Sequence, residues 1–110
     1  FSIADFSRAI ELKPENASFH SRRGRVYHEL KNYECALVDY NKAIELDPNQ
    51  SSAIYNIACI YALQNEPIDA CSWLSRAIAL NPDFKKLAKE DEDFCLIQDL
   101  PEYKLIVLQG

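Results

Sequence analysis

Three arginines stand close together in the stretch SRRGR, at Arg22, Arg23 and Arg25. Guanidinium groups bind phosphates and carboxylates through paired hydrogen bonds, so such a cluster is typical of an anion-binding surface. A nucleic-acid surface needs a broad basic face, whereas this chain of 110 residues has a net charge of −5. The composition therefore argues against a nucleic acid as partner. It leaves an acidic protein segment, or a structural role, for the three arginines.

The other reactive side chains are too scattered to predict a catalytic or metal centre. His20 and His28 are eight residues apart, which on a helix is about 12 Å, too far to share a metal ion. His20 falls among packing positions and is expected in the core. The cysteines form no CxxC pair, and no glycine-rich phosphate loop is present. We therefore expect no enzyme, no metal and no cofactor.

The cysteines are expected to be free thiols, which favours a cytoplasmic, reducing compartment. They are Cys35, Cys59, Cys71 and Cys95.

An acidic run occupies Glu90–Asp93. It lacks the glycine turn and the ligand spacing of a calcium-binding loop. We interpret it as a solvent-exposed helix start, where the helix dipole stabilises negative charge. No apolar run approaches the roughly 20 residues that cross a bilayer, so no membrane contact is expected.

Three segments of the chain are nearly copies of one another. DFSRAIELKP, DYNKAIELDP and WLSRAIALNP end at Pro14, Pro48 and Pro82, which are 34 residues apart. Three copies in register at this spacing indicate stacked units of supersecondary structure. With only 2 glycines, and with many alanines, leucines and glutamates, the units are expected to be helical.

Each unit is expected to form two antiparallel helices. Apolar residues recur at steps of three and four on both sides of a break at Lys31–Asn32. The repeated prolines end each second helix, because the residue before a proline avoids the helical conformation. Pro67 suits a first helical turn, where its missing N–H costs nothing. Small residues are expected where helices approach closely, at Gly24, Ala36, Ala43, Ala58, Ala70 and Ala77.

The period and its pattern resemble the tetratricopeptide repeat family, over about residues 1–84. The resemblance implies an all-α fold, a right-handed α–α superhelix of stacked antiparallel helix hairpins. We expect the second helix of a partial first repeat over 1–14, full repeats over 15–48 and 49–82, and C-terminal capping helices over 83–110. The family's positions are filled in the second repeat by His20, Arg23, Gly24, Tyr27, Ala36, Tyr40, Ala43 and Pro48, and in the third repeat by Ile54, Ile57, Ala58, Tyr61, Ala70, Leu74, Ala77 and Pro82.

Beyond Pro82 the repeat pattern decays. A short helix is expected near Phe84–Lys89 and a last one after Pro101. Such an end covers the last hydrophobic face of a repeat array. The alternative is that the apolar tail Leu105–Leu108 docks onto a partner or onto a continuation of the chain.

The resemblance implies protein–protein interaction, with a partner peptide in the concave groove lined by the first helices. Residues not used in packing there recur at steps of three and four, and so share one face of each helix. Their basic, aromatic and polar character suits a peptide with acidic and apolar side chains. The candidate contacts are Ser18, Ser21, Arg22, Arg25, Glu29, Ser52, Tyr55, Asn56, Cys59, Leu63 and Lys86.

Some relatives clamp a C-terminal carboxylate with lysine, asparagine and arginine side chains. Asn56 and Lys86 match that set, but Glu90 stands where it needs an arginine. An acid there would repel a carboxylate, which argues against a standard clamp.

Arg23 lies inside the apolar stripe of its helix, and a buried guanidinium needs an acidic partner. Asp5 and Asp39 occupy equivalent positions in the second helices of the first two units. In the third unit both polar positions become apolar together, as Ile57 and Trp73. We therefore expect Arg23 to pair with Asp39, Asp5 or both.

Two functions remain open at this stage. The first is a non-catalytic module that binds a partner protein in its groove. The alternative is a self-associating, homo-oligomeric or regulatory domain attached to a catalytic or other domain outside this segment. Fold alone cannot decide between them.

Overall fold

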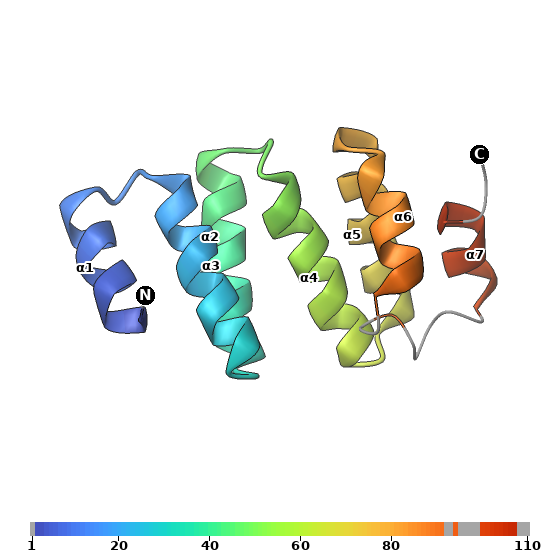
Figure 1. Cartoon of the computed structure of the whole chain (residues 1–110), viewed down its shortest axis with the longest axis horizontal. Coiled ribbons are helices and arrows are strands. Elements are labelled where there is room, and N and C mark those ends of the chain that lie inside the picture. Colours follow the sequence, from blue (N-terminus) through green and yellow to red (C-terminus); the bar gives the residue numbers. More distant parts are fainter. Residues whose placement is uncertain (1, 92–93, 95–99, 108–110) are drawn as a thin grey trace. The chain divides into compact units, whose positions relative to one another are not determined.

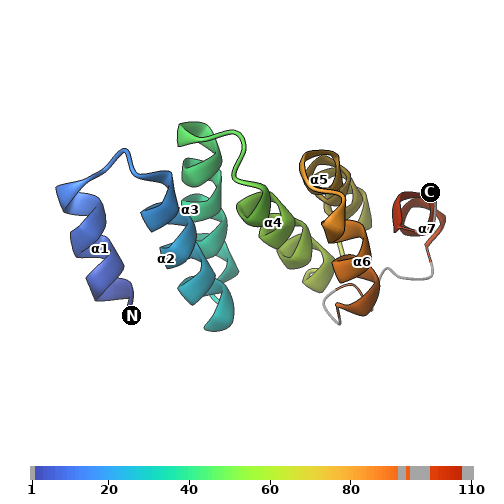
Figure 2. The same cartoon turned by 45° about the horizontal axis from the view of Figure 1, so that its top comes forward.

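The computed structural model describes residues 2–91, 94 and 100–107, and its described residues form helices and no strand (Figure 1). The chain divides into two compact units, Phe1–Ala53 and Ile54–Gly110. The predicted all-α fold is confirmed, and α2 and α3 lie side by side as a hairpin in both views (Figures 1 and 2). The helices are α1 Ile3–Leu12, α2 Ala17–Glu29, α3 Tyr33–Leu46, α4 Ser51–Leu63, α5 Pro67–Leu80, α6 Asp83–Glu90 and α7 Pro101–Val107.

Side-chain caps set where the helices of the first unit begin. Ser2 and Asp5 form a capping box at α1, in which each side chain accepts the backbone N–H of the other residue. The Asn16 amide oxygen accepts the Phe19 N–H at the start of α2, and Asn32 caps α3 in the same way. Such caps satisfy N–H groups that a helix leaves without partners, and each stabilises its helix by about 1 kcal/mol.

The turn between the two helices of a hairpin has the same geometry in both repeats. Lys31 adopts a left-handed backbone with φ of 63°, and the next N–H, of Asn32, donates to the Tyr27 carbonyl at 2.9 Å. Asn65 repeats this conformation with φ of 56°. Both turns are Schellman motifs, which end a helix by satisfying its last carbonyls. The predicted break at Lys31–Asn32 is therefore confirmed.

The prolines act as predicted. The helices α1, α3 and α5 each end two residues before their proline, at Leu12, Leu46 and Leu80. Pro67 and Pro101 are the first residues of α5 and α7.

Close helix contacts form at the small residues, all six of which are buried. Gly24 shows why size matters: a Cβ there would lie 2.9 Å from Cδ1 of Tyr40 and 3.2 Å from Cβ of Asp39. Tyr40 is fully buried and has no room to give way. Only glycine therefore allows α2 to lie this close to α3.

Aromatic side chains near the C-terminus cover the end of the second unit. Phe94 and Tyr103 are buried, and their rings stack with centroids 5.7 Å apart. The Tyr103 hydroxyl donates to the Ala88 carbonyl at 2.8 Å, which ties α7 to α6. The described part of the C-terminal segment thus packs on α6, and its role as a cap of the repeat array stays a prediction. Leu105 is exposed and its docking onto a partner stays a prediction, while Leu108 lies outside the described residues. Within the described ranges, no helix has the length and apolarity that crossing a bilayer requires.

Candidate partner-binding surfaces

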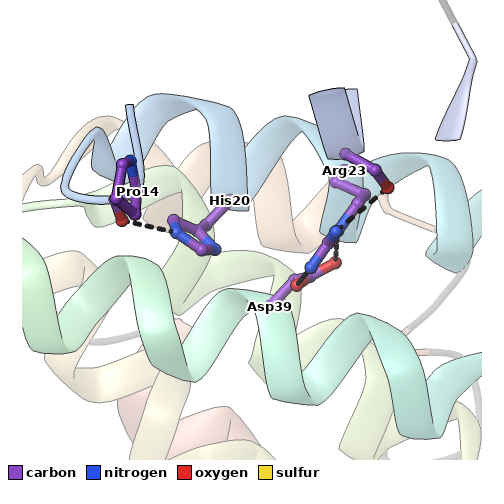
Figure 3. Close-up of polar contacts among 5 residues, drawn as sticks. Pro14, His20, Arg23 and Asp39 are labelled. Atoms are coloured by element: carbon purple, nitrogen blue, oxygen red, sulfur yellow. Dashed lines mark hydrogen bonds and ion pairs between the residues drawn. The ribbon is translucent and has the colours of Figure 1, made fainter. Parts of the chain in front are cut away.

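Arg23 makes the structural ion pair that the sequence predicts (Figure 3). Its Nε donates to Oδ2 of Asp39 at 2.8 Å and its Nη2 to Oδ1 at 2.7 Å, while Nη1 donates to the Ser7 hydroxyl of α1 at 3.1 Å. The Asp39 side chain is only 3% exposed and that of Arg23 is 23% exposed. The hydrogen bond with Asp39 raises the pKa of Arg23 above its ordinary value. Asp5 takes no part, because its carboxylate caps α1.

In the second compact unit, Ile54–Gly110, apolar residues stand at the two positions of this pair. Ile57, at the position of Arg23, is fully buried. Trp73, at the position of Asp39, is half-buried, and the guanidinium of Arg76 lies 5.1 Å from its ring centroid. The two positions thus change together, from an ion pair to two apolar residues.

The other two arginines of the cluster differ from Arg23 in being exposed. Arg22 is exposed on α2, and the side chain of Arg25 is 73% exposed, with Nε 3.4 Å from a carboxylate oxygen of Glu29. Ser21 donates its hydroxyl to the Ser18 carbonyl at 3.2 Å. These five residues recur at steps of three and four, so they lie along one side of α2. We call them the α2 face.

The histidines have structural surroundings. His20 is buried, as predicted, and its Nε2 donates to the Pro14 carbonyl at 3.0 Å (Figure 3). Its Nδ1 has no hydrogen-bond partner in the part of the chain that the structure describes. His28 packs edge-on against Tyr33 and Tyr40. No group of three or more histidine, cysteine or acidic side chains among the described residues could hold a metal ion.

In the second unit the structure buries two of the predicted contacts. Tyr55 and Cys59 are 4% and 2% exposed, so neither lies on an open surface. The Tyr55 ring stacks on Phe84 with centroids 4.8 Å apart and meets Phe94 edge-on at 5.8 Å. This burial is the main cause that raises the pKa of Tyr55, and the neighbouring Cys59 and Asp91 add to it.

The acidic run also differs from its prediction. Asp91 follows the end of α6 instead of beginning a helix, and one of its carboxylate oxygens accepts the Tyr55 hydroxyl at 2.7 Å and the Cys59 thiol at 3.8 Å. Glu92 and Asp93 lie outside the described residues. Phe94, which follows the run, was the available signal that Asp91 lies against a packed surface.

The remaining predicted contacts are accessible to different degrees. Ser52 and Lys86 are exposed, whereas Asn56 and Leu63 are half-buried. Their role as partner contacts stays a prediction.

Two hollows of about 390 and 480 Å³ in the first unit share Arg23, Val38 and Asp39. None of the predicted contacts lines either hollow. The α2 face is therefore a surface, separate from these hollows.

Comparison with family models decides the classification. A TPR repeat model matches residues 24–65 and a tetratricopeptide repeat model matches residues 51–84. The chain belongs to the tetratricopeptide repeat family. Tetratricopeptide repeats are protein-interaction modules, which bind through extended surfaces built by neighbouring repeats.

Several curated proteins are similar to this chain over part of their length. A protein SGT1 homolog from Oryza sativa is 33% identical over 80% of this chain and 25% of its own length. A PEX5-related protein from Rattus norvegicus is 33% identical over 80% of this chain and 15% of its own. A UDP-N-acetylglucosamine–peptide N-acetylglucosaminyltransferase from Giardia intestinalis is 45% identical over 46% of this chain but only 3% of its own. The chain thus spans a quarter or less of each relative.

Proposed function

We propose that this tetratricopeptide repeat chain is a non-catalytic module that holds a segment of a partner protein in the groove lined by its first helices. The α2 face supplies the contacts in the first unit, and the partner segment there is acidic. Membership of the repeat family supports the interaction role. The similarity to the SGT1 homolog and to the PEX5-related protein, each over 80% of this chain, supports it further.

The proposal rests on the difference in pairing and exposure among the three arginines. Arg23 is fully engaged by Asp39 and Ser7, whereas Arg22 and Arg25 remain exposed on the same helix. The exposed pair of Arg25 with Glu29 adds little to stability, as such pairs contribute about 0–1 kcal/mol. Arg25 can therefore exchange Glu29 for a carboxylate of a partner at little cost.

Charge reversal on the α2 face tests the proposal. The probe is an immobilised library of acidic 15-residue peptides, each paired with a copy in which glutamate and aspartate are replaced by glutamine and asparagine. Wild-type chain should retain acidic peptides over their neutral copies. The variant Arg22→Glu/Arg25→Glu should lose this preference, and the preference of the wild type should weaken as salt is added, because exposed charges are screened.

A matched control carries the same change in net charge elsewhere in the first unit. Arg8→Glu/Lys42→Glu reverses two exposed cations on α1 and α3 and should retain the wild-type peptides. If Arg22→Glu/Arg25→Glu bound the same peptides as the wild type, the α2 face would not be the binding surface.

A further inference from the structure

The face of α4 in the second unit already holds a ligand, supplied by the chain itself. The Asp91 carboxylate accepts the Tyr55 hydroxyl at 2.7 Å and lies within 3.8 Å of the Cys59 sulfur. Three residues later, Phe94 is 1% exposed and meets the Tyr55 ring edge-on at 5.8 Å. An acid and a phenylalanine three positions apart thus contact Tyr55, and the acid also Cys59, on the side of α4 where the repeat pattern predicts partner contacts.

Capping alone does not explain the acid. An apolar side chain would cover α4 without losing the hydration of a carboxylate, and a charge taken out of water is costly unless it is paired. The cap also has its own attachment, the hydrogen bond from Tyr103 to the Ala88 carbonyl. Asp91 instead accepts the Tyr55 hydroxyl at 2.7 Å, and a hydrogen bond to a carboxylate is of the short, strong and directional kind; the weaker thiol donor of Cys59 lies 3.8 Å from the same oxygen. This arrangement is typical of a site that binds a carboxylate.

The receiving surface is held in place by its own packing. The Tyr55 ring is stacked on Phe84 with an interplanar angle of 13°, which fixes the direction of its hydroxyl. Cys59 lies one helical turn further along α4. A surface whose donors are already ordered loses little side-chain entropy when it binds a carboxylate.

We propose that this α4 face is a binding site for a protein segment that carries an acidic residue and, three positions later, a phenylalanine, and that Asp91 and Phe94 occupy the site in cis. A partner reaches the site by displacing them. Because a tethered segment acts at an effective concentration in the millimolar range, the internal copy blocks weak ligands. The inference deepens the proposed function, since it names a ligand class for a second face of the same module.

The test supplies the internal ligand in trans. The probe is a fluorescently labelled peptide AKEDEDFSL, the sequence of residues 88–96 with Cys95→Ser. The receptor is the full chain with Asp91→Ala/Phe94→Ala, which vacates the site. Fluorescence anisotropy should show that this variant binds the peptide at least tenfold more tightly than the wild type. A peptide with asparagine in place of the first aspartate should bind at least tenfold more weakly.

Matched variants of α4 identify the site. Tyr55→Phe, added to the vacated chain, removes the hydroxyl donor but keeps the ring and should weaken peptide binding about tenfold. Tyr61→Phe on the same helix is the control and should change nothing. Arg22→Glu/Arg25→Glu should also leave this binding unchanged, so failure here is distinguishable from failure on the α2 face.

Three results would overturn the inference. The vacated chain could keep its helical circular dichroism and yet not bind the peptide. Peptide binding could be indifferent to Tyr55→Phe. The vacated chain could also lose its cooperative thermal transition, which would make Asp91 and Phe94 part of the core and not a ligand.

Discussion

Removal of the Arg23 guanidinium tests whether this arginine supports the fold or binds a ligand. Arg23→Ala deletes the bidentate pair with Asp39 and the hydrogen bond to Ser7. The reverse change, Asp39→Ala, deletes the acidic partner. The double variant removes both charges at once.

The expected magnitudes follow from the exposure of the two groups. After Arg23→Ala, the Asp39 carboxylate, 3% exposed, remains buried without its cation, which costs about 3–5 kcal/mol of unfolding free energy. After Asp39→Ala the guanidinium, 23% exposed, still reaches water and Ser7, so the loss should be smaller, about 2–3 kcal/mol. The double variant leaves no buried charge, and we expect it to be more stable than Arg23→Ala alone.

Urea unfolding followed by circular dichroism gives the three free energies and closes a double-mutant cycle. Arg22→Ala, an exposed neighbour on the same helix, is the control and should change stability by less than about 0.5 kcal/mol. The structural assignment fails if Arg23→Ala keeps wild-type stability but loses binding of the acidic peptides. It also fails if the two single losses simply add.

Three further predictions concern individual positions. Gly24→Ala should destabilise by about 1–2 kcal/mol, measured by urea unfolding, because the clash of its Cβ with Tyr40 outweighs the higher helix propensity of alanine; a gain in stability would contradict the close contact. Lys31→Gly should stabilise by about 0.5–1 kcal/mol, since glycine adopts the positive φ without strain, and Asn65→Gly should gain less because asparagine tolerates that conformation; equal gains would refute this. The raised pKa of Tyr55 predicts falling stability above pH 10, where the unfolded chain releases a proton that the folded chain retains. This group should lower the free energy of unfolding by about 1.4 kcal/mol at pH 11 relative to pH 9. Urea unfolding at both pH values should show a fall that is smaller by that amount in Tyr55→Phe; an equal fall in the wild type and the variant would contradict the prediction.

The sequence predicted those features that repeat. Proline spacing located the helix ends, and the paired change from Arg23 and Asp39 to Ile57 and Trp73 revealed an ion pair between residues 16 positions apart. The comparison worked because each repeat supplies a reference for the next, so a residue that departs from the pattern points to a compensating departure. The same register separated the half-buried, paired Arg23 from the exposed Arg22 and Arg25.

The sequence failed where the repeat ends. The contact between Tyr55 and Asp91 joins residues 36 positions apart, and Asp91 belongs to a segment with no counterpart in the earlier units. Helical periodicity assigned Tyr55 to the side of α4 away from the packing residues. It could not show that the chain returns to cover that side. Tyr55 and Cys59 were therefore expected as groove contacts, and the structure buries them.

The hydrogen bond from Arg23 to Ser7 has a consequence for how the chain opens. None of the ten residues of α1 is fully buried, and its apolar side chains Ile3, Phe6 and Ile10 are only half-buried. In a linear array each element is held by its intrinsic stability and by coupling to its neighbours. The hydrogen bond from Arg23 to Ser7 therefore couples the stability of α1 to that of the α2–α3 hairpin. On heating, α1 should detach as a separate early step, and its amides should exchange with solvent before those of the hairpin.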